Sequence, residues 1–264
     1  MLDMIWAFLL LGAAVGFFAG LLGIGGGGIM VPVLVGLFAG MGFAPEHVVH
    51  QALATSMAAI ILTSASSAWH HHRQQAVLWP VAWKLGIGVV IGTMLTSQLA
   101  SALDARWLAW IFAGFMSYVS LQMLLNFKPA PSRTLPAALP LAGVGLGIGG
   151  ISALVAIGGG TMTVPFLSWC NVRLPQAIGT SAAVGLPIAI SGSVGYMLSG
   201  MSATGLAVGS VGYVYLPAVV CISLVSIFTV PLGVHCAHRL PVLWLKRIFA
   251  LLLLTLAGKM LLTV

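Results

Sequence analysis

Charge is what this sequence lacks most. Of its 264 residues only 5% are charged, with 10 Lys and Arg against 3 Asp and Glu, whereas 60% are hydrophobic. A soluble globular domain carries about a quarter charged residues. So few charges cannot cover a surface that faces water, so hydrocarbon must be the solvent for most of the chain. The lipid bilayer is therefore the first partner that the composition predicts.

Acidic residues are the scarcest of all, and each of the three lies near the end of an apolar run: Asp3, Glu46 and Asp104. A membrane enzyme needs a nucleophile, base or metal constellation, and no acid stands within the apolar runs to complete one. The same scarcity removes the intramembrane carboxylate that often relays protons. We therefore expect no enzymatic activity, and any ion movement by this chain would be driven by membrane potential, with proton transfer through His50 or His235 as the alternative.

Cysteine is also rare, and the three residues Cys170, Cys221 and Cys236 have no spacing typical of a metal site. They are interpreted as small core side chains, and no cofactor or metal is expected. The basic residues stand singly or in pairs at the ends of apolar runs. Nucleic-acid binders instead gather Lys and Arg on one polar face, so no nucleic-acid partner is expected.

Long apolar runs dominate what is present. The start Met-Leu-Asp-Met lacks a basic leader segment, so the first run is expected to remain as a span. Two runs are shorter than the ~20 residues of a full span, and each of these follows a glycine cluster and contains a proline, which predicts broken helices at a transport site. The runs cover roughly 5–23, 29–43 (short), 52–69, 78–103, 107–125, 135–156, 162–170 (short), 175–197, 206–236 and 243–262.

The basic residues indicate an orientation. Arg73, the linker that contains Lys128 and Arg133, and the segment from Arg239 to Arg247 are expected in the cytoplasm by the positive-inside rule. Counting crossings back from Arg73 places both termini outside, provided that each short segment returns the chain across the membrane.

An internal duplication runs through the chain. Its matching segments keep their order, while their separation drifts as loops change length: 165 − 32 = 133, 181 − 56 = 125 and 244 − 107 = 137. The matched pairs are Ile24–Pro32 with Ile157–Pro165, Gln51–Ser56 with Gln176–Ser181, and Trp107–Ala113 with Trp244–Ala250.

An odd number of crossings in each half makes the duplication an inverted repeat, an architecture common among secondary transporters. The sequence thus predicts an all-α polytopic membrane protein with about five hydrophobic segments per repeat. The first repeat is expected over residues 1–127, a cytoplasmic linker over 128–134 and the second repeat over 135–264.

The glycine cluster that runs into Met-x-Val-Pro, followed by Ala-Thr-Ser and its counterpart Gly-Thr-Ser, resembles the TauE/SafE sulfite exporter family. The resemblance covers nearly the whole chain. It implies a multi-pass carrier in the inner cell membrane for sulfite, for a sulfonate such as sulfoacetate, or for a related small anion. The histidine run His70–His72 departs from the family pattern.

The glycine clusters are the first candidate site. Glycine allows sharp turns that expose N–H groups, and a helix N-terminus adds unpaired donors with partial positive charge. Two such termini meeting near the midplane would hold an organosulfur anion without a fixed cation; the alternative is close helix packing through small residues. The candidates are Gly25, Gly26, Gly27, Gly28, Gly158, Gly159, Gly160 and the adjacent Thr161.

Hydroxyl and amide side chains form a second group. Their hydrogen-bond donors suit sulfonate oxygens, although serine and threonine in spans commonly bond the carbonyl one turn back. Arg173 is included because its charge would attract an anion. This group contains Thr55, Ser56, Thr180, Ser181, Gln51, Gln176 and Arg173.

Several questions stay open at this point. A channel-like pore for an anion or a metal ion is the alternative function. The sequence also leaves open which anion is carried, in which direction, and whether the protein forms a homodimer.

Overall fold

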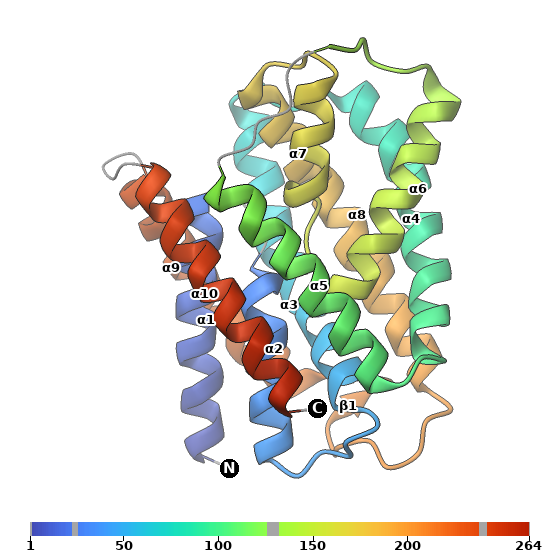
Figure 1. Cartoon of the computed structure of the whole chain (residues 1–264), viewed down its shortest axis with the longest axis vertical. Coiled ribbons are helices and arrows are strands. Elements are labelled where there is room, and N and C mark those ends of the chain that lie inside the picture. Colours follow the sequence, from blue (N-terminus) through green and yellow to red (C-terminus); the bar gives the residue numbers. More distant parts are fainter. Residues whose placement is uncertain (1, 23–25, 126–131, 238–241, 264) are drawn as a thin grey trace.

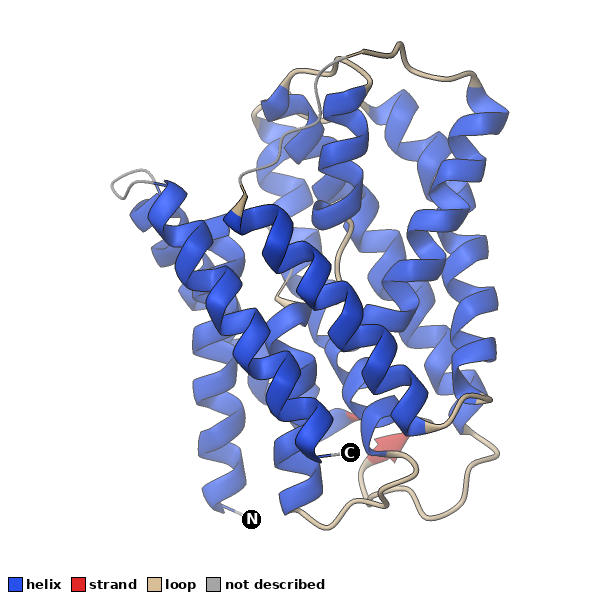
Figure 2. Ribbon diagram, in the orientation of Figure 1, coloured by secondary structure: helices blue, strands red, loops and turns tan. Residues whose placement is uncertain are grey.

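The computed structural model describes residues 2–22, 26–125, 132–237 and 242–263, which form ten α-helices and one small β-hairpin (Figures 1 and 2). The helices and strands are α1 (Leu2–Leu22), α2 (Gly27–Gly40), α3 (Val48–Arg73), α4 (Trp79–Ser101), α5 (Ala105–Leu124), α6 (Ala138–Val155), α7 (Gly160–Trp169), α8 (Leu174–Gly200), β1 (Ser210–Val211), β2 (Val214–Tyr215), α9 (Leu216–Ala237) and α10 (Val242–Thr263).

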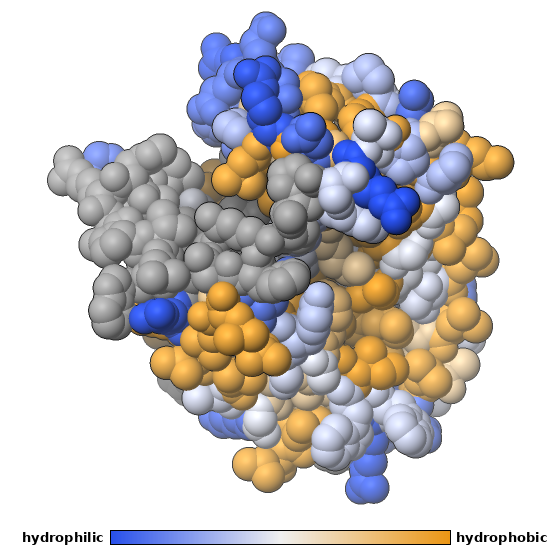
Figure 3. Space-filling model, turned by 45° about the horizontal axis from the view of Figure 1, so that its top comes forward, coloured by the Kyte–Doolittle hydropathy of each residue, from blue (hydrophilic) through white to orange (hydrophobic). Residues whose placement is uncertain are grey.

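The described helices have the length and the exposed apolar side chains of membrane spans. Six of those described, α3, α4, α5, α6, α8 and Leu216–Gly233 of α9, are long and apolar enough to cross a bilayer. Large apolar side chains point outward, among them Trp83 and Leu99 of α4, which are 69% and 67% exposed. Hydrophobic residues cover much of the face seen in Figure 3. The prediction of an all-α polytopic membrane protein is confirmed.

The two termini lie at the same end of the bundle (Figure 1). We call this the terminal end, and the opposite end the linker end. Residues 132–137 before α6, the α3–α4 link and the α7–α8 link gather at the linker end, where Leu78, Arg133 and Arg173 line one cavity. The α2–α3 and α4–α5 links share the terminal end, where His47 and Asp104 line another cavity.

Two helix pairs are locked by glycines. On α6, an ideal Cβ at Gly145 would lie 2.3 Å from the carbonyl oxygen of Leu85, and one at Gly149 would lie 2.3 Å from that of Val89. Real Cβ atoms do not approach that closely, so α4 and α6 are in contact backbone to backbone. This is the small-residue packing that brings helices together in membranes, where lipid removes the hydrophobic drive.

The pair α1 and α9 is locked in the same way. A Cβ at Gly12 would lie 2.7 Å from the carbonyl oxygen of Ile222, and one at Gly16 would lie 2.5 Å from that of Ser226. Gly12 and Gly16 precede the two α6 glycines by the same separation as the duplicated glycine elements, since 145 − 12 = 133 and 149 − 16 = 133.

The two short helices begin inside the bundle. An ideal Cβ at Gly26, the N-cap of α2, would meet the side chain of Val15 in the middle of α1, whereas one at Gly159, the N-cap of α7, would lie 3.3 Å from the Ser181 carbonyl oxygen of α8. Both helices start two residues before the positions expected from the sequence, near Ile29 and Met162. They are 14 and 10 residues long, too short to span a bilayer.

The apolar run predicted over 206–236 was too long. Its first ten residues form turns and the β1–β2 hairpin, and α9 begins only at Leu216. Gly205, Gly209 and Gly212 adopt positive φ values of 79°, 93° and 54°, which a continuous helix does not allow. Hydropathy could not detect this, because an apolar hairpin and an apolar helix have the same composition.

Candidate functional site

Several polar groups gather at the start of α7, inside the bundle. Its N-cap Gly159 makes no side-chain capping bond, so the first N–H groups of the helix lack a side-chain partner. The Thr163 hydroxyl oxygen is fully buried and has no hydrogen-bond partner among the residues that the structure describes. A Cβ built on Gly159 would lie 3.2 Å from that oxygen. Donors from the backbone and a free hydroxyl thus converge on one turn, an arrangement that suits an anion.

Helix α3 adds another hydroxyl, that of Ser64, near the start of α7. A Cβ at Gly185 of α8 would lie 3.7 Å from the Gly159 nitrogen and 3.5 Å from the Ser64 hydroxyl oxygen, so both groups lie beside this glycine. Ser64, Gly160 and Thr161 are all partly exposed. The N-terminus of α7 is therefore bordered by partly exposed hydroxyls from α3 and α7, while Gly159 and Thr163 themselves are buried.

The start of α2 has a different environment. Gly26, Gly27 and Gly28 are buried, and Gly25 lies outside the described residues. A Cβ at Gly28 would meet side chains of Leu253 and Met116. The N-cap Gly26 makes no side-chain capping bond, as at α7. Apolar side chains thus close off the α2 N-terminus, and the two predicted glycine clusters differ in access and in polarity.

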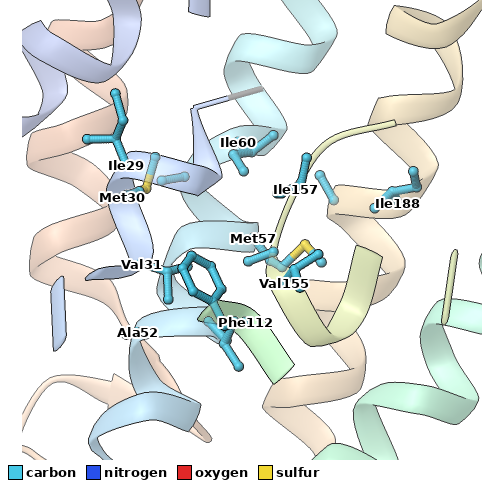
Figure 4. Packing of buried hydrophobic residues seen from close by; sticks show 14 of the residues in the cluster. Ile29, Met30, Val31, Ala52, Met57, Ile60, Phe112, Val155, Ile157 and Ile188 are labelled. Carbon is cyan, nitrogen blue, oxygen red and sulfur yellow. The ribbon is translucent and has the colours of Figure 1, made fainter. Parts of the chain in front are cut away.

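The two glycine elements nevertheless come together. A Cβ at Gly27 would lie 1.8 Å from the carbonyl oxygen of Ala156, a left-handed residue (φ 47°) that ends α6. Figure 4 shows Ile60 of α3 and Ile157 of the α6–α7 link between the start of α2 and α8. Gly27 of the first glycine element thus contacts the residue just before the second element, with apolar side chains around the contact and the polar groups on the α7 side. Anion binding between the two helix starts stays a prediction.

The Thr-Ser pairs occupy equivalent places in the two halves. The Thr55 hydroxyl oxygen accepts the N–H of Tyr215 at 3.0 Å, and the Thr180 hydroxyl oxygen accepts the N–H of Leu78 at 3.0 Å. Each threonine thus holds the chain where a long helix begins, and keeps its own proton to donate. The Ser56 hydroxyl is buried without a partner, and Ser181 is 3% exposed.

The remaining predicted residues lie away from the bundle centre. Gln51 donates from Nε2 to the Ser210 hydroxyl at 3.1 Å, at the terminal end. Gln176 and Arg173 line a cavity of about 400 Å³ at the linker end, together with Arg133. The candidates that the structure describes therefore separate into a central group and groups at the two ends.

A larger cavity of about 1070 Å³ opens at the terminal end. It contains both Glu46 and Asp104, with Arg106 as the one Lys or Arg side chain of its lining. His50 donates from Nε2 to the carbonyl oxygens of Ala100 and Leu103, at 3.1 and 3.0 Å. Among the described residues, no three His, Cys, Asp or Glu side chains are placed to hold a metal ion.

Two residues of the α7 site were missed from sequence. Thr163 and Ser64 were not singled out, because one-dimensional matching favours positions that repeat in both halves, and these do not. Met30 stands at the place of Thr163, since 163 − 133 = 30. A hydroxyl in only one of two matched glycine elements was the available signal.

Comparisons with known proteins agree on one family. A family model described as sulfite exporter TauE/SafE matches residues 8–260. A "probable membrane transporter protein" of Haemophilus influenzae is 37% identical over 96% of both chains. One of Methanocaldococcus jannaschii is 23% identical over 88% of this chain and 86% of its own, and one of Bacillus subtilis is 25% identical over 70% and 76%. No solved structure matches.

Proposed function

Because the chain belongs to the TauE/SafE sulfite exporter family, we propose that it carries a small organosulfur anion, sulfite or a sulfonate, across the inner cell membrane. The observation that carries the proposal is the buried, unpartnered Thr163 hydroxyl beside the uncapped start of α7. A buried hydroxyl without a partner is costly, and an anion in the α7 turn would satisfy it together with the helix N–H groups.

The binding mode follows from what the centre lacks. Helix N–H groups and hydroxyls attract an anion more weakly than a buried lysine or arginine would, so the anion is held and can also leave. The α2 terminus offers a second set of N–H groups when the apolar side chains around it move apart. Binding between the two N-termini is thus the state that we propose for the fully engaged anion, with the α7 terminus as the first contact.

We further propose that the halves are inverted repeats and work as two gates. Corresponding helices make corresponding pairings, α4 with α6 and α1 with α9. The matched glycines Gly12 and Gly145, and the matched Thr55 and Thr180, support the same equivalence. The short helices break this equivalence, because α2 packs against α10 as well as α3, whereas α7 packs chiefly against α8. Alternating access requires that the gate in one half is closed while the gate in the other half is open.

The positive-inside rule, applied to Arg73 and Arg133, places the linker end in the cytoplasm. The decisive experiment is flux into proteoliposomes, with sulfite, sulfoacetate, thiosulfate and sulfate offered in parallel. The proposal expects saturable movement of sulfite or the sulfonate. Movement of none of the four would refute it, and flux that rises linearly with concentration would favour a channel-like pore.

A further inference from the structure

The linker-end cavity concentrates positive charge. Arg133 and Arg173 both line it, beside the polar side chains of Asn171 and Gln176, and none of the described residues of its lining is Asp or Glu. Its volume of about 400 Å³ is large enough for a small anion such as sulfite. This volume lies within the ~300–1,000 Å³ that is typical of small-molecule pockets. We call it the arginine pocket.

Arg133 is exposed, and the backbone around it is anchored to the end of α7. The backbone N–H groups of Ser132 and Arg133 both donate to the Trp169 carbonyl oxygen, at 3.2 Å each. The indole Nε1 of Trp169 donates to the Ser132 hydroxyl at 2.7 Å. The guanidinium lies 5.3 Å from the centroid of that indole ring, a cation–π contact. The chain entering the second half is thus fastened to the last residue of α7, with its arginine at the pocket.

Arg173 stands where a cation is electrostatically unfavourable. It is the N-cap of α8, a position that favours Asp, Ser or Asn because the helix N-terminus carries partial positive charge. A second cation, Arg133, lines the same pocket. An anion between the two arginines would offset the repulsion between Arg173 and the helix N-terminus and the repulsion between Arg173 and Arg133. A guanidinium is well suited to this, because its N–H groups pair with the oxygens of an oxyanion.

The cavity at the opposite end has the reverse balance. Glu46 and Asp104 oppose the single Arg106 there, a formal −1, whereas the two arginines of the linker-end cavity give +2. Both cavities lie at links that follow a short helix, the α2–α3 link and the α7–α8 link. The ends of the molecule therefore present unequal potentials to an approaching anion.

We propose that the arginine pocket is the capture site for the transported anion, and that the acidic cavity at the terminal end is its release mouth. The inference rests on the proposed function and adds a residue set and a direction to it. Helix α7 begins at the central site and ends at the pocket, and its ten residues extend roughly 15 Å. An anion collected by the two arginines thus has one short helix to pass before it reaches Thr163.

The test compares flux from each side in proteoliposomes of known orientation, with radiolabelled sulfite. In the variant Arg133→Gln/Arg173→Gln, we expect KM from the linker side to rise roughly 5- to 20-fold, the effect of about 1–2 kcal/mol of lost attraction. The rate at saturation from the linker side should stay within about twofold. Because a passive carrier has the same ratio of maximal rate to KM from both sides at zero voltage, the terminal side should show the loss as a lower rate at saturation, with its KM within about twofold. Raising ionic strength should raise the wild-type KM from the linker side and leave that of the double variant nearly unchanged.

Two matched controls isolate the pocket. Arg73→Gln removes a cation from the linker end outside the pocket lining, and Arg106→Gln removes one from the opposite cavity; neither should raise KM from the linker side. A double variant with unchanged KM, or with KM raised equally from both sides, would overturn the capture site. If wild type moves sulfite, that result leaves the proposed function standing.

Equilibrium binding keeps the two proposals separable. Purified protein at low ionic strength should bind radiolabelled sulfite less tightly after Arg133→Gln/Arg173→Gln, and equally well after Arg106→Gln. That outcome supports the pocket even if wild type moves none of the four anions, in which case only the transport proposal fails. Equal binding by wild type and double variant would contradict the pocket.

Discussion

The hydroxyl oxygen of Thr180 accepts the backbone N–H of Leu78 at 3.0 Å. Leu78 is the N-cap of α4, so a threonine of the second half closes the start of a helix in the first. Thr55 closes the start of α9 from the other direction, through Tyr215. The threonines of the duplicated Thr-Ser motif therefore connect each half to the other, at the start of α4 and at the start of α9.

Removing this tie should lower stability. Thr180→Val leaves the Leu78 N–H without its acceptor, and we expect a loss of about 1–2 kcal/mol, as for other caps and part-buried hydrogen bonds. Thr180→Ser keeps the oxygen and should lose much less. Thermal unfolding in detergent measures both variants. A valine variant as stable as the serine variant would mean that the bond contributes nothing.

The α4–α6 lock makes a sharper prediction, because α6 contains its own control. A Cβ at Gly145 would lie 2.3 Å from the Leu85 carbonyl oxygen, whereas one at Gly147, two residues on, meets nothing within 4 Å. Gly145→Ala should force the helices apart and cost about 1–3 kcal/mol or more. Gly147→Ala should be neutral or stabilising, since alanine favours helix. Equal melting temperatures for the two variants would contradict the backbone contact.

Thr163 should separate stability from binding. Its hydroxyl has no hydrogen-bond partner in the part of the chain that the structure describes, so Thr163→Val should unfold at the same or a higher temperature than wild type. The same change should raise KM for the anion roughly 10- to 100-fold, the value of a hydrogen bond to a charged group. Thr163→Ser should restore most of the affinity. A valine variant that is folded and transports with normal KM would exclude this hydroxyl from the site.

Charge sign at the α7 start gives an independent check. Gly159→Asp and Gly159→Asn add side chains of nearly the same size at a position where a Cβ is already tight, 3.2 Å from the Thr163 hydroxyl. Steric damage should therefore be equal, and only aspartate should repel an anion. We expect flux to fall at least roughly tenfold further in the aspartate variant. Equal flux in folded forms of both variants would argue against an anion at this turn.

The architecture was largely predictable from sequence, because it depends on patterns that a single chain displays. Hydropathy marks spans, and glycine clusters before short proline-containing runs predicted α2 and α7 to within two residues of their starts. Surroundings were not predictable. Thr55 and Thr180 look free in the sequence, yet the partners of their oxygens, Tyr215 and Leu78, lie 160 and 102 residues away.

The same holds for the candidate site: several of its residues could be found from the sequence, but their surroundings could not. Matching the halves identified Gly159 and Gly27 together, but it could not reveal that apolar side chains surround the second while partly exposed hydroxyls border the first. Arg173 was chosen for its charge, and its neighbour Arg133 was assigned only to topology. Their shared pocket depends on how the linker folds back onto Trp169, which no local pattern encodes.

In the proposed mechanism an organosulfur anion is held at the centre by uncharged donors, and no carboxylate stands within the apolar runs to couple a proton. Membrane potential then supplies the drive, about 2.3 kcal/mol per charge per 100 mV, or roughly 4.6 kcal/mol for a divalent anion, more than a thousandfold in concentration ratio.

The most direct test uses proteoliposomes with equal pH on both sides and a valinomycin-set potassium diffusion potential. The account predicts saturable movement of radiolabelled sulfite toward the positive side, faster as the potential grows and lost in a folded Gly159→Asp variant. With voltage clamped at zero, a pH gradient should change only the protonation of sulfite itself. Sulfite flux that ignores the potential, or strong pH-driven accumulation at zero voltage that a folded His50→Ala or His235→Ala variant abolishes, would contradict it.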